Sequence, residues 1–231
     1  MAIILFTLSG FLLGIRHAFD ADHVAAISSF AAKNKSIKKS SLLGMFWGFG
    51  HATALLLIGL IILSLKITIP ENISLLLELI VGVMLVILGV NTILTANKNK
   101  IHFHKHSHGQ ERHIHFHSHK ATKNHAHEHL PFYQSVFVGL VHGLAGSAAL
   151  TLLVLAAVKS FWIGLIYILI FGIGSIAGMM AVSSIISLPF TLIPNKFEKI
   201  QKILRMGTGL TSAIIGFVMM YEIGFLGDLI I

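Results

Sequence analysis

Six apolar stretches run through this 231-residue chain, and each is long enough to cross a lipid bilayer as a helix. They cover residues 2–32, 41–65, 73–95, 132–158, 161–188 and 206–223. Charged residues make up 11% of the sequence, against about 25% in soluble domains, and 55% of the residues are hydrophobic. The sequence therefore predicts an all-α polytopic membrane protein with six transmembrane helices.

Basic residues gather in alternate loops. Fourteen of the 17 lysines and arginines follow the first, third or fifth apolar stretch, whereas the opposite loops contain only Lys66 and Lys159. By the positive-inside rule, the three basic segments lie in the cytoplasm and both termini lie outside. We therefore expect a multi-pass protein of the cytoplasmic (inner) membrane, whose net charge of +8 reflects topology and not a nucleic-acid partner.

The two halves of the chain resemble each other. Gly14–His17 matches Gly139–His142 at an offset of 125 residues, and Trp47–His51 resembles Phe171–Ser175 at an offset of 124. Each half contains three apolar stretches, so the halves would face opposite ways across the membrane. The pattern predicts a 3+3 inverted repeat, and transporters of that build place their substrate near the midplane, at interrupted helices.

A histidine-rich segment, residues 98–130, separates the first repeat (1–97) from the second (131–231). Its eleven histidines are His102, His104, His106, His108, His113, His115, His117, His119, His125, His127 and His129. Alternating histidine cannot bury a core, so the segment is predicted to be a disordered cytoplasmic loop that binds metal.

Five ionisable side chains interrupt the first apolar stretch within residues 16–23, Arg-His-Ala-Phe-Asp-Ala-Asp-His. Each charge at bilayer depth costs about 2.5–3.5 kcal/mol, so the cluster needs a functional reason. The chain has no cysteine, and imidazole with carboxylate suits a divalent transition metal. His17, Asp20, Asp22 and His23 are therefore candidate ligands. Their counterparts in the second half, 125 residues later, are His142, Ala145, Ser147 and Ala148. We expect one asymmetric site.

Helix geometry leaves the role of the two carboxylates open. On a regular helix, at about 100° per residue, His17, Asp20 and His23 share a sector of about 120° and Asp22 points elsewhere. That arrangement favours Asp20 as a ligand, with Asp22 beside Arg16 or supporting the ligands from outside. A break in the helix would bring Asp22 in instead. Arg16 is expected to offset a carboxylate when the metal is absent.

Other candidates lie on later helices. His51 follows a glycine-rich segment of the second stretch and is a further candidate ligand, as is His142. Asn91 and Thr92 in the third stretch would support the ligands or form hydrogen bonds between helices.

The motif from His17 to His23 resembles the H-x4-D-H signature of the nickel/cobalt transporter (NiCoT) family, in its wider R-H-A-x-D-A-D-H form. Phe49–Thr53 is similar to that family's second motif around a Gly-His pair. The resemblance implies metal recognition by His17, Asp22, His23 and His51, with Asp20 in the wider signature. The longer members have a leading span and a later acidic motif; here Gly143–Ala149 stands at that place. The chain is thus similar to a shorter branch of urease-accessory or sulfite-exporter-like membrane proteins.

These observations predict a Ni²⁺ or Co²⁺ permease without a prosthetic group. The chain has no Walker A sequence and no H-E-x-x-H, so neither ATP hydrolysis nor metalloprotease activity is expected, and the protein is not an enzyme. An inward-negative potential drives a divalent cation inward, which favours uptake. Export by proton antiport and a non-transporting, metal-sensing accessory subunit remain alternatives. The expected partners are the bilayer, the metal ion and, as a candidate, a cytoplasmic metallochaperone.

Overall fold

A computed structural model describes residues 2–32, 34, 36–97, 105–108, 111–114, 130–157, 160–194 and 197–226. Its helices are α1 (Ala2–His17), α2 (Ala21–Ala31), α3 (Ile37–Leu65), α4 (Glu71–Asn97), α5 (Leu130–Ala157), α6 (Phe161–Leu192) and α7 (Glu198–Tyr221), followed by the π-helical turn η3 (Glu222–Leu226). The strands β1 (Lys105–His108) and β2 (Glu111–Ile114) form an antiparallel pair. The bundle itself is all-α, as predicted.

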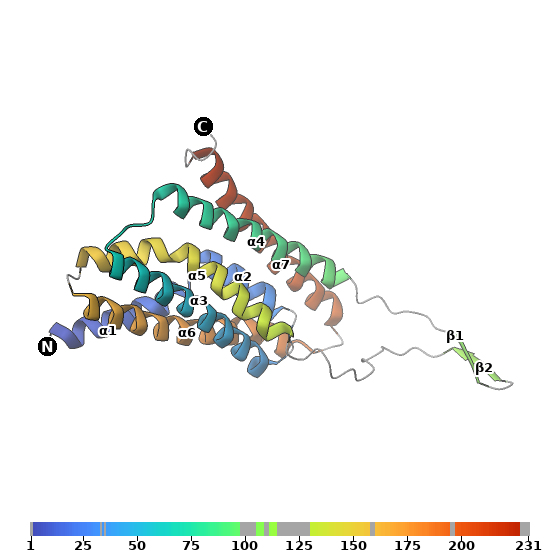
Figure 1. Cartoon of the computed structure of the whole chain (residues 1–231). Helices are drawn as coiled ribbons and strands as arrows, with labels where there is room; N and C mark the ends of the chain where they lie inside the picture. Colours follow the sequence, from blue (N-terminus) through green and yellow to red (C-terminus); the bar gives the residue numbers. More distant parts are fainter. Residues whose placement is uncertain are drawn as a thin grey trace.

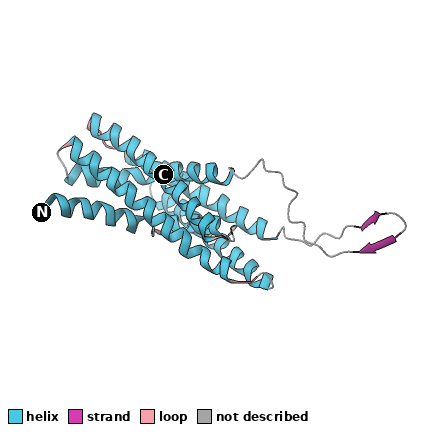
Figure 2. Ribbon diagram, turned by 90° about the horizontal axis from the view of Figure 1, so that it is seen from below, coloured by secondary structure: helices cyan, strands magenta, loops and turns pink. Residues whose placement is uncertain are grey.

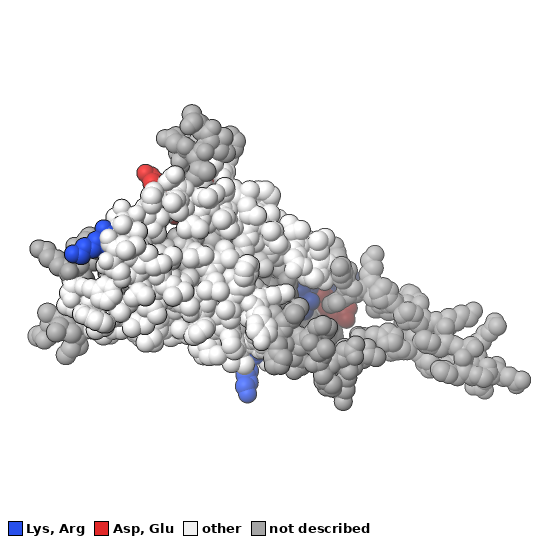
Figure 3. All heavy atoms as spheres, in the orientation of Figure 1, with Lys and Arg blue, Asp and Glu red and all other residues white. Residues whose placement is uncertain are grey.

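The helices form an elongated bundle whose two ends differ (Figures 1 and 2). We call the end where α4 ends and α5 begins the loop end, and the end where α1 begins the terminal end. Helix α3 begins at the loop end, α6 begins at the terminal end, and α7 runs back toward the terminal end (Figure 1). Charged side chains on the face in Figure 3 lie toward its periphery, and its middle is uncharged.

Four segments of the described chain are long and apolar enough to cross a membrane, namely α3, α4, α6 and Glu198–Gly224. The first predicted span is divided into α1 and α2, of 16 and 11 residues, each shorter than the roughly 20 residues that one span needs. The fourth predicted span corresponds to α5, which has 28 residues. The count of six spans remains a prediction.

Two helix boundaries differ from the prediction. Helix α7 begins at Glu198 rather than at residue 206, because its basic first turns are good helix formers even though they are polar. Gln201 fixes this start by donating from Nε2 to the carbonyl oxygen of Ile193 at 2.8 Å. Helix α6 continues past Pro189 to Leu192, and the N–H of Ile193 still bonds to the carbonyl oxygen of Pro189.

Corresponding residues of the two halves make corresponding contacts. A Cβ added at Gly14 would clash with the carbonyl oxygen of Phe171, and one added at Gly139 would clash with that of Trp47. Gly14 corresponds to Gly139 in the sequence, and Trp47 corresponds to Phe171. These glycines therefore allow α1 to approach α6, and α5 to approach α3, in the same way.

Helices α4 and α7 pack on each other through glycine pairs. Gly82 lies against Gly216 and Gly89 lies against Gly209, so that each helix contributes two glycines seven residues apart. The buried Ser212 hydroxyl donates to the carbonyl oxygen of Leu85 at 3.0 Å and adds a polar contact between the same helices.

The predicted histidine-rich loop falls largely outside the described residues. Of this segment, only β1 and β2 are described, paired so that His106 lies opposite His113. Residues 98–104, 109–110 and 115–129, with most of the eleven histidines, lie outside the described part. Disorder and metal binding in this loop remain predictions.

Candidate metal site

The helix of the first predicted span breaks within the polar motif. Helix α1 ends at His17, and the N–H groups of Ala18, Phe19 and Asp20 each bond three residues back along the chain. Asp20 has the extended backbone of an N-cap (φ −61°, ψ 147°), and α2 begins at Ala21. The regular-helix arrangement is therefore wrong, and the broken-helix alternative is the one observed.

The break brings four histidines together from four helices. His17 ends α1, His23 lies in the first turn of α2, His51 is on α3 and His142 is on α5. The side chains of His23, His51 and His142 are 1%, 0% and 2% exposed. Ring centroids lie 4.4 Å apart for His17 and His23, and 4.2 Å apart for His23 and His142. Such a cluster of buried imidazoles is expected at a metal site.

Three of these histidines already have the spacing of metal ligands. His17, His23 and His51 each offer a ring nitrogen, and the three atoms lie within 4.8 Å of one another. The Nε2 atoms of His17 and His51 are 3.2 Å apart. Two imidazole nitrogens about 2.1 Å from one ion, as on zinc, lie about 3.0–3.4 Å apart at bond angles between square and tetrahedral. The pair therefore needs little movement to bind one ion.

The two carboxylates orient the rings. Asp20 Oδ2 lies 2.8 Å from His17 Nδ1, and Asp22 Oδ1 lies 3.0 Å from His23 Nδ1. An ionised carboxylate only accepts, so each Nδ1 donates and each Nε2 is left for a metal, an arrangement common around metal-binding histidines. His23 Nε2 is buried and has no hydrogen-bond partner within the described part of the chain.

Asp22 joins the two halves of the molecule. Its Oδ1 also accepts from the backbone N–H of His23 at 2.9 Å, and its Oδ2 lies 2.8 Å from His142 Nε2. Asp22, His23 and His142 thus form a second group whose ligand atoms lie within 4.8 Å of one another. His23 belongs to both groups, which places it at the centre of the cluster.

The cluster lies at the middle of the long helices. His51 is the central residue of the 29-residue helix α3, and His142 is the thirteenth of the 28 residues of α5. At 1.5 Å per residue, each is about 20 Å from the helix ends.

Three other predicted residues lie apart from the cluster. Arg16 is exposed, and the ion pairs that Asp20 and Asp22 make in the described chain are with histidines, not with Arg16. Thr92 donates to the carbonyl oxygen of Leu88 at 2.8 Å and also contacts that of Ser29 on α2, while Asn91 is exposed. Ser29 is six residues, or about 9 Å, along α2 from His23. The contacts of Thr92 are those of helix packing.

Sequence reasoning missed three residues that surround the cluster. The Trp47 ring lies 5.5 Å from the ring of His23 and 5.6 Å from that of His142. The Phe171 ring lies 5.4 Å from that of His17. A Cβ added at Gly146 would lie 3.8 Å from His17 Nε2, so this glycine leaves room beside the ligand atoms. Trp47 precedes His51 by one helical turn, which was a usable signal.

The chain is similar to known nickel-transport and urease accessory proteins. The family model described as high-affinity nickel-transport protein (NicO) matches residues 3–221. The urease accessory protein UreH of Bacillus sp. (strain TB-90) is 40% identical over 215 residues, which cover 93% of this chain and 90% of UreH. The nickel transporter NicT of Mycobacterium tuberculosis (strain ATCC 25618 / H37Rv) is 47% identical over 47 residues, 20% of this chain and 13% of NicT. No solved structure matches.

Proposed function

This chain belongs to the family of high-affinity nickel-transport proteins (NicO), and on that premise we propose that it is a permease that takes up Ni²⁺, and Co²⁺ as a second substrate, through the histidine cluster. The family confirms the resemblance to nickel transporters inferred from the motifs. It also confirms that the protein is not an enzyme and that Ni²⁺ is the substrate of its family. The 3.2 Å spacing of His17 Nε2 and His51 Nε2 is the observation that supports this site most directly.

We propose His17, His23 and His51 as the ligands that hold the ion, each through Nε2. Asp20 and Asp22 then keep two of these rings in the binding tautomer, and Asp22 offers its second oxygen, with His142, as the next position. Because His23 belongs to both groups, the ion would pass from one group to the other without losing all protein contacts.

Uptake is the proposed direction. A potential of 100 mV contributes about 2.3 kcal/mol per charge, so an ion with two charges gains about 4.6 kcal/mol on entry. Export by proton antiport would have to overcome this energy. A non-transporting accessory role is the second candidate, because the relative that covers most of this chain is named a urease accessory protein.

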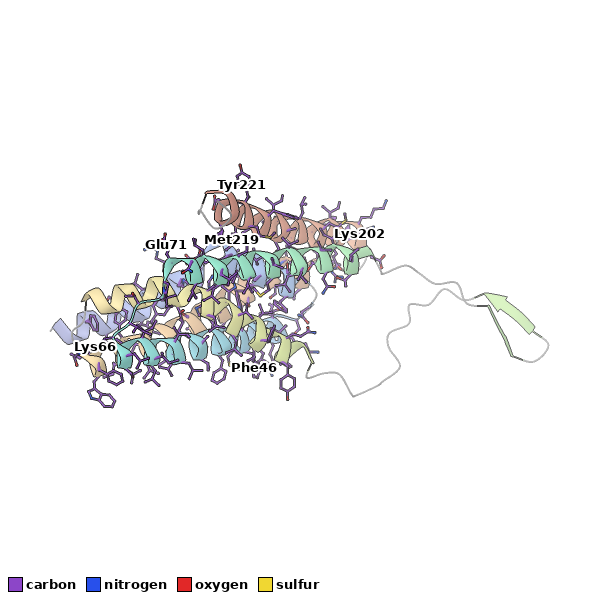
Figure 4. All side chains as sticks on the ribbon, turned by 45° about the horizontal axis from the view of Figure 1, so that its top comes forward. Phe46, Lys66, Glu71, Lys202, Met219 and Tyr221 are labelled. Carbon is purple, nitrogen blue, oxygen red and sulfur yellow. The ribbon has the colours of Figure 1, made fainter. Side chains whose placement is uncertain are left out.

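The loop end is proposed to face the cytoplasm and both termini the outside, in the cytoplasmic (inner) membrane. Lys202 lies at the loop end, whereas Glu71 and Tyr221 lie at the opposite end (Figure 4). Lys38, Lys39, Lys199 and Arg205 belong to helices that begin at the loop end, as the positive-inside rule requires of a cytoplasmic face. A reporter fused after residue 231 should be active outside the cytoplasm, and cytoplasmic activity would reverse this topology.

We propose that the membrane domain is a 3+3 inverted repeat, with α1, α2, α3 and α4 related to α5, α6 and α7. The reciprocal contacts of Gly14 with Phe171 and of Gly139 with Trp47 support it. So does the pair α4 and α7, in which Gly82 and Gly89 meet Gly216 and Gly209. Such repeats move against each other around a fixed midplane site in many transporters.

The histidine-rich loop is proposed to collect the ion on the cytoplasmic side and to deliver it to a metallochaperone. Imidazole titrates near pH 6.5, so at neutral pH most loop histidines are free to bind metal.

Flux of radioactive Ni²⁺ into liposomes tests the proposal. Purified protein should carry Ni²⁺ down either gradient, faster with an inside-negative potential, and His51→Ala should stop it. Thr53→Ala is the matched control, because this residue lies two positions further on α3 and its hydroxyl donates only to the carbonyl oxygen of Phe49. Ni²⁺ binding without flux would favour the accessory role.

A further inference from the structure

Two aromatic rings lie on opposite sides of the histidine cluster. Trp47 precedes His51 by four residues on α3, and Phe171 precedes Ser175, the counterpart of His51, by four residues on α6. Four residues advance about 6 Å along a helix. Since α3 begins at the loop end and α6 at the terminal end, Trp47 lies on the loop side of the cluster and Phe171 on the terminal side (Figure 1).

A small cavity lies beside Trp47, and its mainly apolar lining includes three serines and no histidine. It has a volume of about 10 Å³ and is lined by residues of α2, α3, α5 and α6. Its lining includes Ser40, Ser135 and Ser183, of which Ser135 donates its hydroxyl to the carbonyl oxygen of Leu43. One water molecule needs about 10–15 Å³, so the cavity admits at most one water and no hydrated ion.

Two polar groups in this lining lack partners. Ser40 and Trp47 are each only 1% exposed, so water does not reach them from the surface. Ser40 Oγ and Trp47 Nε1 nevertheless form no hydrogen bond within the described residues. A buried polar group without a partner is unfavourable and rare in folded proteins. Such groups beside a permeation site are expected where water or an ion passes in another conformation.

The exposed side chains of the polar motif lie at the α1–α2 break, whereas Trp47 is buried. At the break between α1 and α2, the side chains of Asp20, Asp22 and His17 are 54%, 27% and 21% exposed. A carboxylate this exposed at the middle of a membrane requires water, because lipid cannot solvate it. On the loop side, Trp47 covers His23 and His142, and Gly139 of α5 packs directly on the Trp47 backbone.

We propose that Trp47 is the loop-side gate of the ion path and that Ser40, Ser135 and Ser183 line the next step beyond it. The inference rests on the proposed transport function. The structure is then the conformation open at the α1–α2 break and closed at the loop end. Movement of α2 and α5 away from α3 would widen the cavity and let Ni²⁺ pass over these hydroxyls. Phe171 is the corresponding gate on the terminal side.

Thiol labelling tests the gate, because the chain has no cysteine of its own. Ser40→Cys is introduced as the only cysteine, and an impermeant maleimide is applied to sealed membrane vesicles of both orientations, with and without Ni²⁺. A closed gate that opens in about 0.1–10% of molecules keeps labelling slow. Labelling from the loop side should speed up with Ni²⁺, and about tenfold or more when Trp47→Ala is added. Ser212→Cys, equally buried between α4 and α7, should stay unlabelled throughout.

Equal labelling of Ser40→Cys with and without Ni²⁺, in both Trp47 and Trp47→Ala backgrounds, would overturn the gate. So would an equal increase caused by Phe171→Ala. If Trp47→Ala does not reach the membrane, labelling of Ser40→Cys is measured in the Trp47→Phe background instead. The effect of Ni²⁺ on labelling of Ser40→Cys in the presence of Trp47 is then the second test. Radioactive Ni²⁺ flux by the unaltered protein is measured in the same vesicles. If that flux is absent, the proposed function fails; if it is present and labelling does not respond, only the gate fails.

Discussion

In the first half of the molecule, the helix that contains His17 stops at that residue and a new helix starts at Ala21; in the second half, α5 continues without a break past the corresponding residue, His142. The broken half has Asp20 and Asp22 within and just after the turn, where they orient His17 and His23. The continuous half has Ala145 and Ser147 in their places, and the Ser147 hydroxyl donates within its own helix, to the carbonyl oxygen of Leu144.

This difference explains how two similar halves form one site. A continuous helix would point Asp20 and Asp22 in different directions, whereas the break lets both carboxylates face histidines. The second half then contributes packing and a single histidine. Four predictions test this division of roles, beginning with the largest expected effect on the site and ending with the smallest.

His23→Ala should have the largest effect. His23 is the one residue that belongs to both ligand groups, and its buried Nε2 has no partner in the described chain. Mutation of a group that only supports a ligand typically lowers metal affinity by roughly 10–100-fold. Removal of a ligand itself should lower it further, so we expect no detectable Ni²⁺ uptake. Uptake is measured together with the amount of protein in the membrane. Near-normal uptake would remove His23 from the ligand set.

Asp22→Asn should reduce Ni²⁺ affinity by about 10–100-fold, because Asp22 holds both His23 and His142. Asp20→Asn should lower Ni²⁺ affinity by about tenfold or less, since the Asp20 side chain is half exposed and pairs with His17. Equilibrium binding of Ni²⁺ to both purified variants gives the comparison. A larger loss of Ni²⁺ affinity in Asp20→Asn would make Asp20, and not Asp22, the more important carboxylate.

His142→Ala should weaken binding by about tenfold and spare the geometry of His17 and His51. His142 contacts His23 and Asp22 but does not belong to the group of His17, His23 and His51, so its removal leaves these three imidazoles in place. His17→Ala, the change at the corresponding position of the first half, is the matched comparison and should abolish binding. An equal loss of Ni²⁺ affinity in His142→Ala and His17→Ala would mean that both histidines bind the ion directly.

Replacing the eleven loop histidines with serine should have the smallest effect on the site. Apparent affinity for Ni²⁺ offered from the terminal side should stay unchanged, because a polar loop cannot lie in the hydrocarbon next to the cluster. Capacity, or affinity from the loop side, should fall. Complete loss of flux in a normally folded variant would place the loop on the ion path.

Much of the site was predictable from the sequence because ionisable residues are rare in apolar helices. His17, Asp22, His23, His51 and His142 were all candidates, and all lie in the cluster. The sequence did not decide whether the helix breaks between α1 and α2, because Ala18-Phe-Asp20 has no glycine or proline to mark a break. The turn is set by tertiary contacts, such as that of Ala18 with Gly178 on α6.

The features that were missed are apolar or small. Trp47 looks like a core residue of a membrane helix, and in the sequence only its position one helical turn before His51 distinguishes it; the structure adds its contacts with His23 and His142. The seven-residue spacing of Gly82 and Gly89, matched by Gly209 and Gly216, is visible in the sequence but is common in membrane helices. Asn91 and Thr92 were polar enough to be considered as supports for the ligands, yet the Thr92 hydroxyl donates to the carbonyl oxygen of Leu88 and contacts that of Ser29 on α2.

The proposed ligands, imidazoles supported by carboxylates, have a consequence for the ions that would compete with nickel. Without thiolate or thioether ligands, the cluster has little preference for soft Cu⁺, but nitrogen ligands bind divalent ions in the Irving–Williams order, in which Cu²⁺ exceeds Ni²⁺. Affinity alone therefore cannot make this protein selective for nickel over cupric ions. With the proposed ligands, discrimination would have to come from the coordination geometry that the α1–α2 break imposes.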